Sequence, residues 1–161
     1  MTEVERIADQ MRRAFEGKAW CGSSLREVLA DVTANEAASK PVANGLSIWE
    51  MVLHLAAWKG AVRQRLAGER IKLPADGDFP PVRDTGEEAW RSALELLGRR
   101  HAELRDAVAV VDDSRLDEAI VEGMASVYVT LHGGVQHDLY HASQIALLKK
   151  MQRQPRGRRC D

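Results

Sequence analysis

Helical periodicity across most of the chain is the feature that most constrains its fold. Apolar residues recur at intervals of three and four in four long segments, whereas the alternation typical of strands is nearly absent. This spacing predicts long helices at residues 3–16, 47–67, 85–111 and 126–151, with shorter helical pieces at 24–32 and 35–39. We therefore expect an all-α fold, and four amphipathic helices predict a four-helix bundle.

The helix boundaries are marked by local signals. Ser47 stands three residues before Glu50, a capping box in which each side chain satisfies a free backbone N–H of the other residue. Thr85 and Glu88 repeat the pattern and predict the start of the third long helix. Residues 72–81 between the second and third helices hold three prolines and a glycine, which indicates a loop. This long connection leaves room for a crossover between helices two and three.

Composition narrows the class of protein. A chain of 161 residues with 45% hydrophobic content is long enough for one domain, which we place at 1–151, followed by a basic and frayed tail at 152–161. A formal charge of −1 gives no general attraction to nucleic acid or anionic membranes. No apolar run could span a bilayer, and the charged N-terminus is no signal peptide. We expect a cytoplasmic protein whose cysteines, Cys21 and Cys160, are reduced.

Three histidines are the strongest functional signal. His137 and His141 lie four residues apart in a predicted helix and so share one face, with Cβ atoms roughly 5–6 Å apart. His54 lies in another helix, among apolar residues. If the two helices pack together, three imidazoles can hold one divalent metal and leave a position open, as in catalytic sites. Imidazole ligands favour zinc, nickel, copper or ferrous iron over calcium or magnesium.

Each of these residues also has a purely structural explanation. A helical histidine pair is more often hydrogen-bonded on the surface, and a lone apolar-flanked histidine is more often a core residue. Glu50, one turn before His54, could accept that ring's second N–H or act as a base, but its capping role is at least as strong. His132 falls about 140° from the ligand face at 100° per residue, and we take it as a non-ligand.

Several other residues receive structural interpretations. His101, which stands among charged residues, is expected on the solvated face of its helix. The cations near residue 150 are expected to stabilise a helix C-terminus rather than to bind nucleic acid. The tryptophans are expected to anchor the core and an interface. The chain has no HExxH, no pair of ExxH motifs, no CxxC and no GxSxG, which argues against zincins, di-iron bundles, thioredoxin-like dithiols and α/β-hydrolases.

Three segments together resemble the DinB/YfiT-like family. They are Gly17-Lys-Ala-Trp-Cys-Gly22, Ser47-Ile-Trp-Glu-Met-Val-Leu-His54 with Trp58 after it, and His137-Asp-Leu-Tyr-His-Ala-Ser-Gln-Ile145. The resemblance implies a four-helix bundle, often homodimeric, in which a histidine triad holds a divalent metal. Carried over to this chain, the triad falls on His54, His137 and His141. Some members of the family are similar to S-transferases that use a low-molecular-weight thiol.

Two classes of function follow from these observations. The first is a metalloenzyme, in which zinc or nickel on the triad activates a thiol or a water that attacks a small electrophile; a thiol S-transferase and a metal-dependent hydrolase are its two forms. The second is a metal-binding stress-response bundle without turnover. An open cavity beside the triad, with polar groups converging on it, would favour the enzyme.

Overall fold

The computed structural model describes residues 1–154, and this part of the chain is all-helical, as predicted. Its long helices are α1 (Glu3–Glu16), α4 (Ile48–Leu66), α5 (Glu87–Ala109) and α6 (Val127–Arg153). Two short helices, α2 (Leu25–Leu29) and α3 (Ala34–Ala38), and a 3₁₀ turn, η1 (Asp113–Arg115), complete it. Among the described residues the β-structure is limited to one isolated bridge between Ala119 and Ser126.

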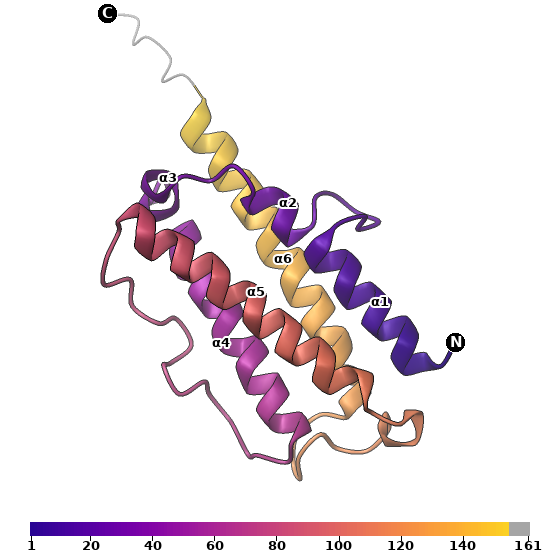
Figure 1. Ribbon diagram of the computed structural model, residues 1–161. Coiled ribbons are helices and arrows are strands. Elements are labelled where there is room, and N and C mark those ends of the chain that lie inside the picture. Colours follow the sequence, from indigo (N-terminus) through magenta and orange to yellow (C-terminus); the bar gives the residue numbers. More distant parts are fainter. Residues whose placement is uncertain (155–161) are drawn as a thin grey trace, which may run out of the picture.

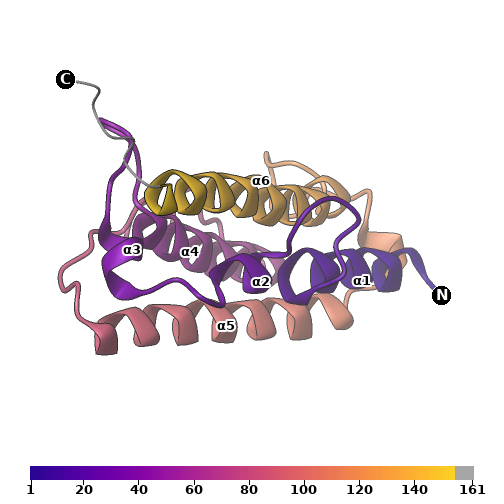
Figure 2. The ribbon, with the colours of Figure 1, turned by 90° about the horizontal axis from the view of Figure 1, so that it is seen from above.

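The long connection between α4 and α5 is a crossover. The loop leaves the end of α4 and returns along its length, so that α5 starts beside the start of α4 and runs in the same direction (Figure 1). Trp49 near the start of α4 accordingly packs on Trp90 near the start of α5, with ring centroids 5.1 Å apart. Helices α1 and α6 run the opposite way (Figure 2). This arrangement lays α6 antiparallel to α4, and these two helices carry the three predicted ligands.

The core is divided into two apolar clusters along the helix axes. One contains Leu55 of α4, Leu97 of α5 and Ile145 of α6, whereas the other contains Leu104 and Leu131. Full burial of each such side chain contributes about 1.5–3 kcal/mol. Between the two clusters lies a layer of buried polar side chains, which are His54, Lys59, His101, Asp138 and His141. Burial of polar groups is costly unless they are hydrogen-bonded, so this layer is the first place to look for a functional site.

The capping box that places α4 is confirmed. The Ser47 hydroxyl accepts a hydrogen bond from the Glu50 N–H at 3.1 Å, and the Glu50 carboxylate accepts one from the Ser47 N–H at 2.7 Å. The second predicted box, at Thr85, is wrong. Helix α5 is capped by Gly86 without a side-chain hydrogen bond, because Asp84 accepts the Gly86 N–H at 2.9 Å and the turn it forms shifts the helix start by one residue.

The C-terminal end of α6 is held by ion pairs. Lys149 and Arg153 both contact Asp31, and Arg153 also binds Glu36. Helix α6 thus continues two residues beyond the predicted end at 151, and the rest of the predicted tail, with Cys160, lies outside the described residues. Cys21 is a free, exposed thiol. None of the described helices combines the length and the apolar character that a membrane span requires.

Candidate metal centre

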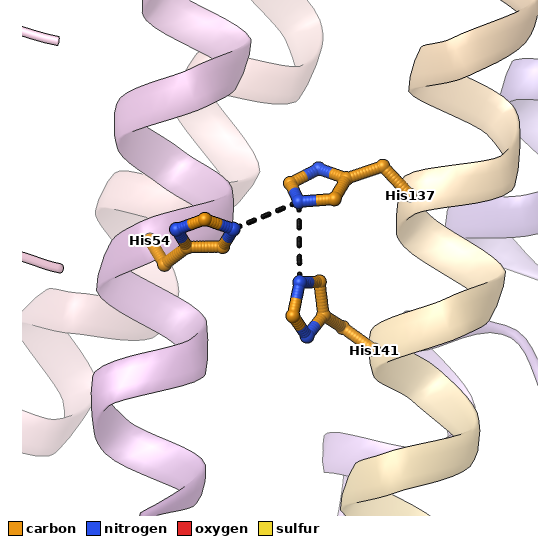
Figure 3. A group of neighbouring side chains, drawn as sticks. All are labelled: His54, His137 and His141. Atoms are coloured by element: carbon orange, nitrogen blue, oxygen red, sulfur yellow. Dashed lines mark hydrogen bonds between the residues drawn. The ribbon is translucent and has the colours of Figure 1, made fainter. Parts of the chain in front are cut away.

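The three predicted ligands come together between α4 and α6. His54 projects from α4, and His137 and His141 project toward it from successive turns of α6 (Figure 3). The Nε2 atom of His137 lies 2.8 Å from Nε2 of His54 and 3.1 Å from Nε2 of His141. Among the described residues, these three side chains form the group that could hold a metal ion, with their candidate ligand atoms within 4.8 Å of one another.

The donor set is one that a divalent transition metal accepts. Zinc–nitrogen bonds of about 2.0–2.1 Å in a tetrahedral site place ligand nitrogens roughly 3.3 Å apart, and the two separations from His137 Nε2, at 2.8 and 3.1 Å, are somewhat shorter. The His54 Nδ1 donates to the backbone carbonyl of Asp78 at 2.6 Å, so in the neutral ring the inward-facing Nε2 keeps its lone pair. The Nε2 atoms of the three rings converge on one region, where they could act together as ligands of one metal ion.

The electrostatics keep two of the rings in the ligand form. Burial lowers the pKa of His137 to about 3, and the neighbouring His141 and His54 add to the fall. Burial likewise lowers the pKa of His141 to about 4, while Gln144 opposes the change. At neutral pH both imidazoles are therefore uncharged, as metal ligation requires.

His54 is held in place by the crossover loop. Phe79 stacks on its ring with centroids 4.2 Å apart, and the Asp78 carboxylate lies 3.2 Å from its Nδ1. The Trp58 indole N–H in turn donates to the same carboxylate at 2.7 Å. Sequence analysis did not find Asp78 or Phe79, because they lie in an irregular segment whose path no periodicity indicates.

An open cavity of about 450 Å³ adjoins the triad between α4 and α6. It is bordered by His54 and His137 and contains a buried ion pair, in which the Lys59 ammonium lies 2.7 Å from both oxygens of Asp138. Lys59 is 5% exposed and Asp138 is 2% exposed, so this pair joins α4 to α6 out of contact with most solvent. Burial raises the pKa of the Asp138 carboxyl, and the Lys59 ammonium opposes the rise. Asp138 thus has a structural role in joining the two helices, and it also lines the cavity.

Two adjacent glycines form part of the cavity wall in the first half of α6. A Cβ atom built on Gly133 or on Gly134 meets no atom within 4 Å, so close packing inside the protein does not require either glycine. Each glycine in a helix interior costs about 1 kcal/mol relative to alanine. The pair therefore weakens α6 next to His137 without any benefit to the packing of the chain.

Glu50 is engaged elsewhere. One carboxylate oxygen accepts the Ser47 N–H and the other accepts the Lys40 ammonium at 2.8 Å. Although partial burial would raise the pKa of Glu50, the hydrogen bonds from Lys40 and Ser47 outweigh it and hold that pKa below its usual value. Glu50 is not among the residues that line the cavity. Its catalytic role stays a prediction.

The expectation that His101 lies on a solvated face is wrong. The side chain is 3% exposed and its ring stacks on Phe15 with centroids 3.7 Å apart. Burial lowers the pKa of His101 to about 3, and the cations at Lys59, Arg105 and Arg26 add to the fall. The spacing Leu97, His101, Leu104 continues the apolar stripe of α5, and this signal outweighs the charged neighbours in sequence.

A family model of the DinB superfamily matches residues 19–145 of the chain. This chain belongs to the DinB superfamily. The match covers all of α4 and α6 as far as residue 145, and it includes His54, His137 and His141. Neither the curated proteins nor the solved structures include a match to this DinB-superfamily chain. Family membership and geometry thus agree on a histidine triad that could bind a metal, and the reaction has to be argued from the site.

Proposed function

We propose that this protein is a divalent-metal-dependent enzyme that transfers a low-molecular-weight thiol to a small electrophile. The observation that carries the proposal is the cavity of about 450 Å³ that opens beside the triad and contains charged side chains. Its size is within the range of ligand-binding sites, whereas a protein that only stores or senses a metal has no need of it. In this proposal, the helices of the protein form a four-helix bundle of the DinB type.

Zinc or nickel on His54, His137 and His141 would supply a positive charge that lowers the pKa of a thiol or a water. In the transfer, the sulfur forms a bond to the electrophilic carbon and the leaving group departs with its electron pair. The thiol proton passes to a base; Glu50 is the candidate from sequence, and it would first have to release its hydrogen bonds with Ser47 and Lys40. A softer ligand than water, a thiolate matches an imidazole-bound transition metal.

The residues around the triad support the placement of a substrate. Trp58 and Phe79 enclose His54 on the side of the crossover loop, and the Asp78 carboxylate fixes the orientation of both Trp58 and His54. The buried pair of Lys59 and Asp138 holds α4 and α6 at a fixed separation across the cavity. A pocket built on two helices keeps substrate and metal at a defined distance, which is where proximity contributes to the rate.

Cobalt substitution tests the proposal directly. Protein loaded with cobalt is titrated with several thiols, bacillithiol, mycothiol and glutathione among them, because sulfur ligation adds an intense near-ultraviolet charge-transfer band. The band should appear with at least one thiol and be absent in His141→Ala, while His132→Ala, a histidine of the same helix outside the triad, should retain it. A spectrum that no thiol changes, together with ester or amide hydrolysis by the metal-loaded protein, would favour the hydrolase instead.

We also propose that the protein is a cytoplasmic homodimer. Trp20 is 99% exposed, and Tyr140 and Leu147 on the outer face of α6 are 61% and 58% exposed. Aromatic and large apolar side chains of this kind are enriched at interfaces. Sedimentation measures the association state, and Leu147→Glu should shift it toward monomer if this face is the contact. A monomeric wild-type protein would contradict the proposal without affecting the metal centre.

A further inference from the structure

The cavity is an elongated groove rather than a round pocket. Its lining runs along α4 from His54 to Arg65 and along α6 from His137 back to Thr130. At about 1.5 Å per residue, the α4 side of the groove from His54 to Arg65 is roughly 16 Å long and the α6 side from Thr130 to Asp138 is roughly 12 Å long. The triad lies at one end of this groove and Arg65 lies at the other.

Apolar side chains line much of the middle of the groove: Trp58 and Val62 from α4, and Leu104 from α5. The buried pair of Lys59 and Asp138 also borders it, while at Gly133 and Gly134 the α6 wall is bare backbone. Since a Cβ atom at either glycine would contact nothing in the protein, any larger residue would project into free space, and that space belongs to the groove. The two glycines therefore leave open a part of the groove that larger side chains would fill.

The far end of the groove presents a positive charge. The Arg65 guanidinium is held by its Nε, which donates to the Ile71 carbonyl at 2.7 Å, and it lies over the Trp58 ring at 5.3 Å. No carboxylate forms an ion pair with Arg65 within residues 1–154, whereas Lys59 is neutralised by Asp138. Asp78, the other acid of the groove, is bound to Trp58 at the metal end.

We infer that Gly133 and Gly134 are specificity-determining residues, and that the groove takes an elongated small molecule with a flat apolar body and an anionic end. The flat body lies between Trp58 and the bare backbone of α6, and the anion, a carboxylate or a sulfonate, lies at Arg65. The inference rests on the proposed function in one respect, since it places the electrophilic end of such a substrate at the triad. Binding itself does not depend on the metal.

The test uses two fluorescent probes and metal-free full-length protein. The probe 8-anilinonaphthalene-1-sulfonate combines flat rings with an anion, and N-phenyl-1-naphthylamine is its uncharged analogue. Gly134→Leu should weaken binding of both probes by at least about tenfold, because the side chain fills the groove. Gly98→Leu is the matched control, since Gly98 is also a helix-interior glycine whose Cβ would meet nothing within 4 Å, but it lines a different cavity.

The charge at Arg65 has its own comparison. Arg65→Gln should weaken binding of the sulfonate probe by about fivefold or more and leave binding of the uncharged probe within about twofold of wild type.

Gly134→Ala should raise the melting temperature, because alanine is the better helix former and no atom is in its way. A lower melting temperature would mean that the fold itself requires the glycine, and the inference would fail.

Three further results would overturn the inference. These are probe binding that Gly134→Leu leaves unchanged, equal losses in Gly134→Leu and Gly98→Leu, and a changed association state in Gly134→Leu with unchanged probe affinity. Thiol transfer assays separate this inference from the proposed function. If Gly134→Leu weakens probe binding but the wild-type protein has no transfer activity, the proposed function is contradicted and the inference about the groove stands. If transfer is equally fast in wild type and Gly134→Leu, the inference about the groove is contradicted and the proposed function stands.

Discussion

Two buried histidine regions lie in the same polar layer of the core, and they differ in almost every respect other than burial. In the triad, three Nε2 atoms converge beside a cavity. His101, by contrast, stacks on Phe15, and neither of its ring nitrogens has a hydrogen-bond partner in the described part of the chain. Burial lowers the pKa of His101 as it does those of His137 and His141. Convergence on a shared open point, rather than burial or a shifted pKa, therefore distinguishes a candidate site from a core residue.

Lys59 connects the two regions. Its ammonium binds Asp138, the residue after His137, and also lies over the Phe15 ring at 5.1 Å from the centroid. His101 stacks on the same phenyl ring, with ring centroids 3.7 Å apart. The Lys59 ammonium thus contacts residues next to both the triad and the Phe15–His101 stack, and its removal should affect both regions.

The largest expected difference between the two regions is in metal content. His137→Ala and His141→Ala should lose nearly all bound metal, since each removes one of three ligands, whereas wild type should hold about one ion per chain. His101→Phe should keep the wild-type content, because among the described residues His101 belongs to no group of three possible ligands. Elemental analysis of untagged protein gives the answer. Full occupancy in both alanine variants would contradict the assignment of the triad.

Breaking the buried ion pair should be the next largest effect. Lys59→Met leaves the Asp138 carboxylate buried without its partner and should lower the free energy of unfolding by about 3–5 kcal/mol. The double variant Lys59→Met with Asp138→Leu should regain most of that loss, because the uncompensated charge is gone. Arg115→Met, which breaks an exposed pair with Glu118, should cost less than about 1 kcal/mol. Equal losses for the buried and exposed pairs, measured by urea denaturation, would show that solvent screens Lys59.

The pH dependence of stability tests the buried environment of His101. The pKa of His101 is about 3 in the folded protein, below the ordinary histidine value of 6.5, so the unfolded chain takes up this proton first. The contribution of the neutral His101 ring to the free energy of unfolding is therefore complete above pH 6.5. It is lost as the pH falls toward 3, at up to about 1.4 kcal/mol per pH unit. His101→Phe removes this contribution, so its stability should fall less steeply over that window. Parallel curves for wild type and variant would mean that folding does not lower the pKa of His101.

The smallest effect concerns the start of the helix that carries His54. Ser47→Ala removes the side-chain acceptor for the Glu50 N–H and should lower the free energy of unfolding by about 1 kcal/mol. Thr85→Ala should leave it unchanged, because α5 is capped without that side chain. The two denaturation midpoints form a direct comparison. A larger loss of stability for Thr85→Ala than for Ser47→Ala would indicate that the Thr85 side chain caps α5, contrary to the structure.

The sequence by itself determined the helices, the start of α4 and the three histidines of the candidate site. These features depend on short-range spacing: residues three and four apart share a helix face whatever the rest of the fold does. The family resemblance, confirmed by the match over residues 19–145, rests on the same local segments. Where the local signal was mixed, as at Thr85 and around His101, the prediction was wrong, although the stripe of Leu97, His101 and Leu104 was present in the sequence.

Only the tertiary structure decided what surrounds the triad. The crossover brings Asp78 and Phe79 to His54, and the antiparallel packing of α6 on α4 brings Asp138 to Lys59. These partners are separated by 24 and 79 residues along the chain, and no periodicity links them. The groove beside Gly133 and Gly134 has the same origin, because an open space is a property of the facing helices together. Local periodicity fixes which side of a helix a residue occupies, and long-range packing fixes what it meets there.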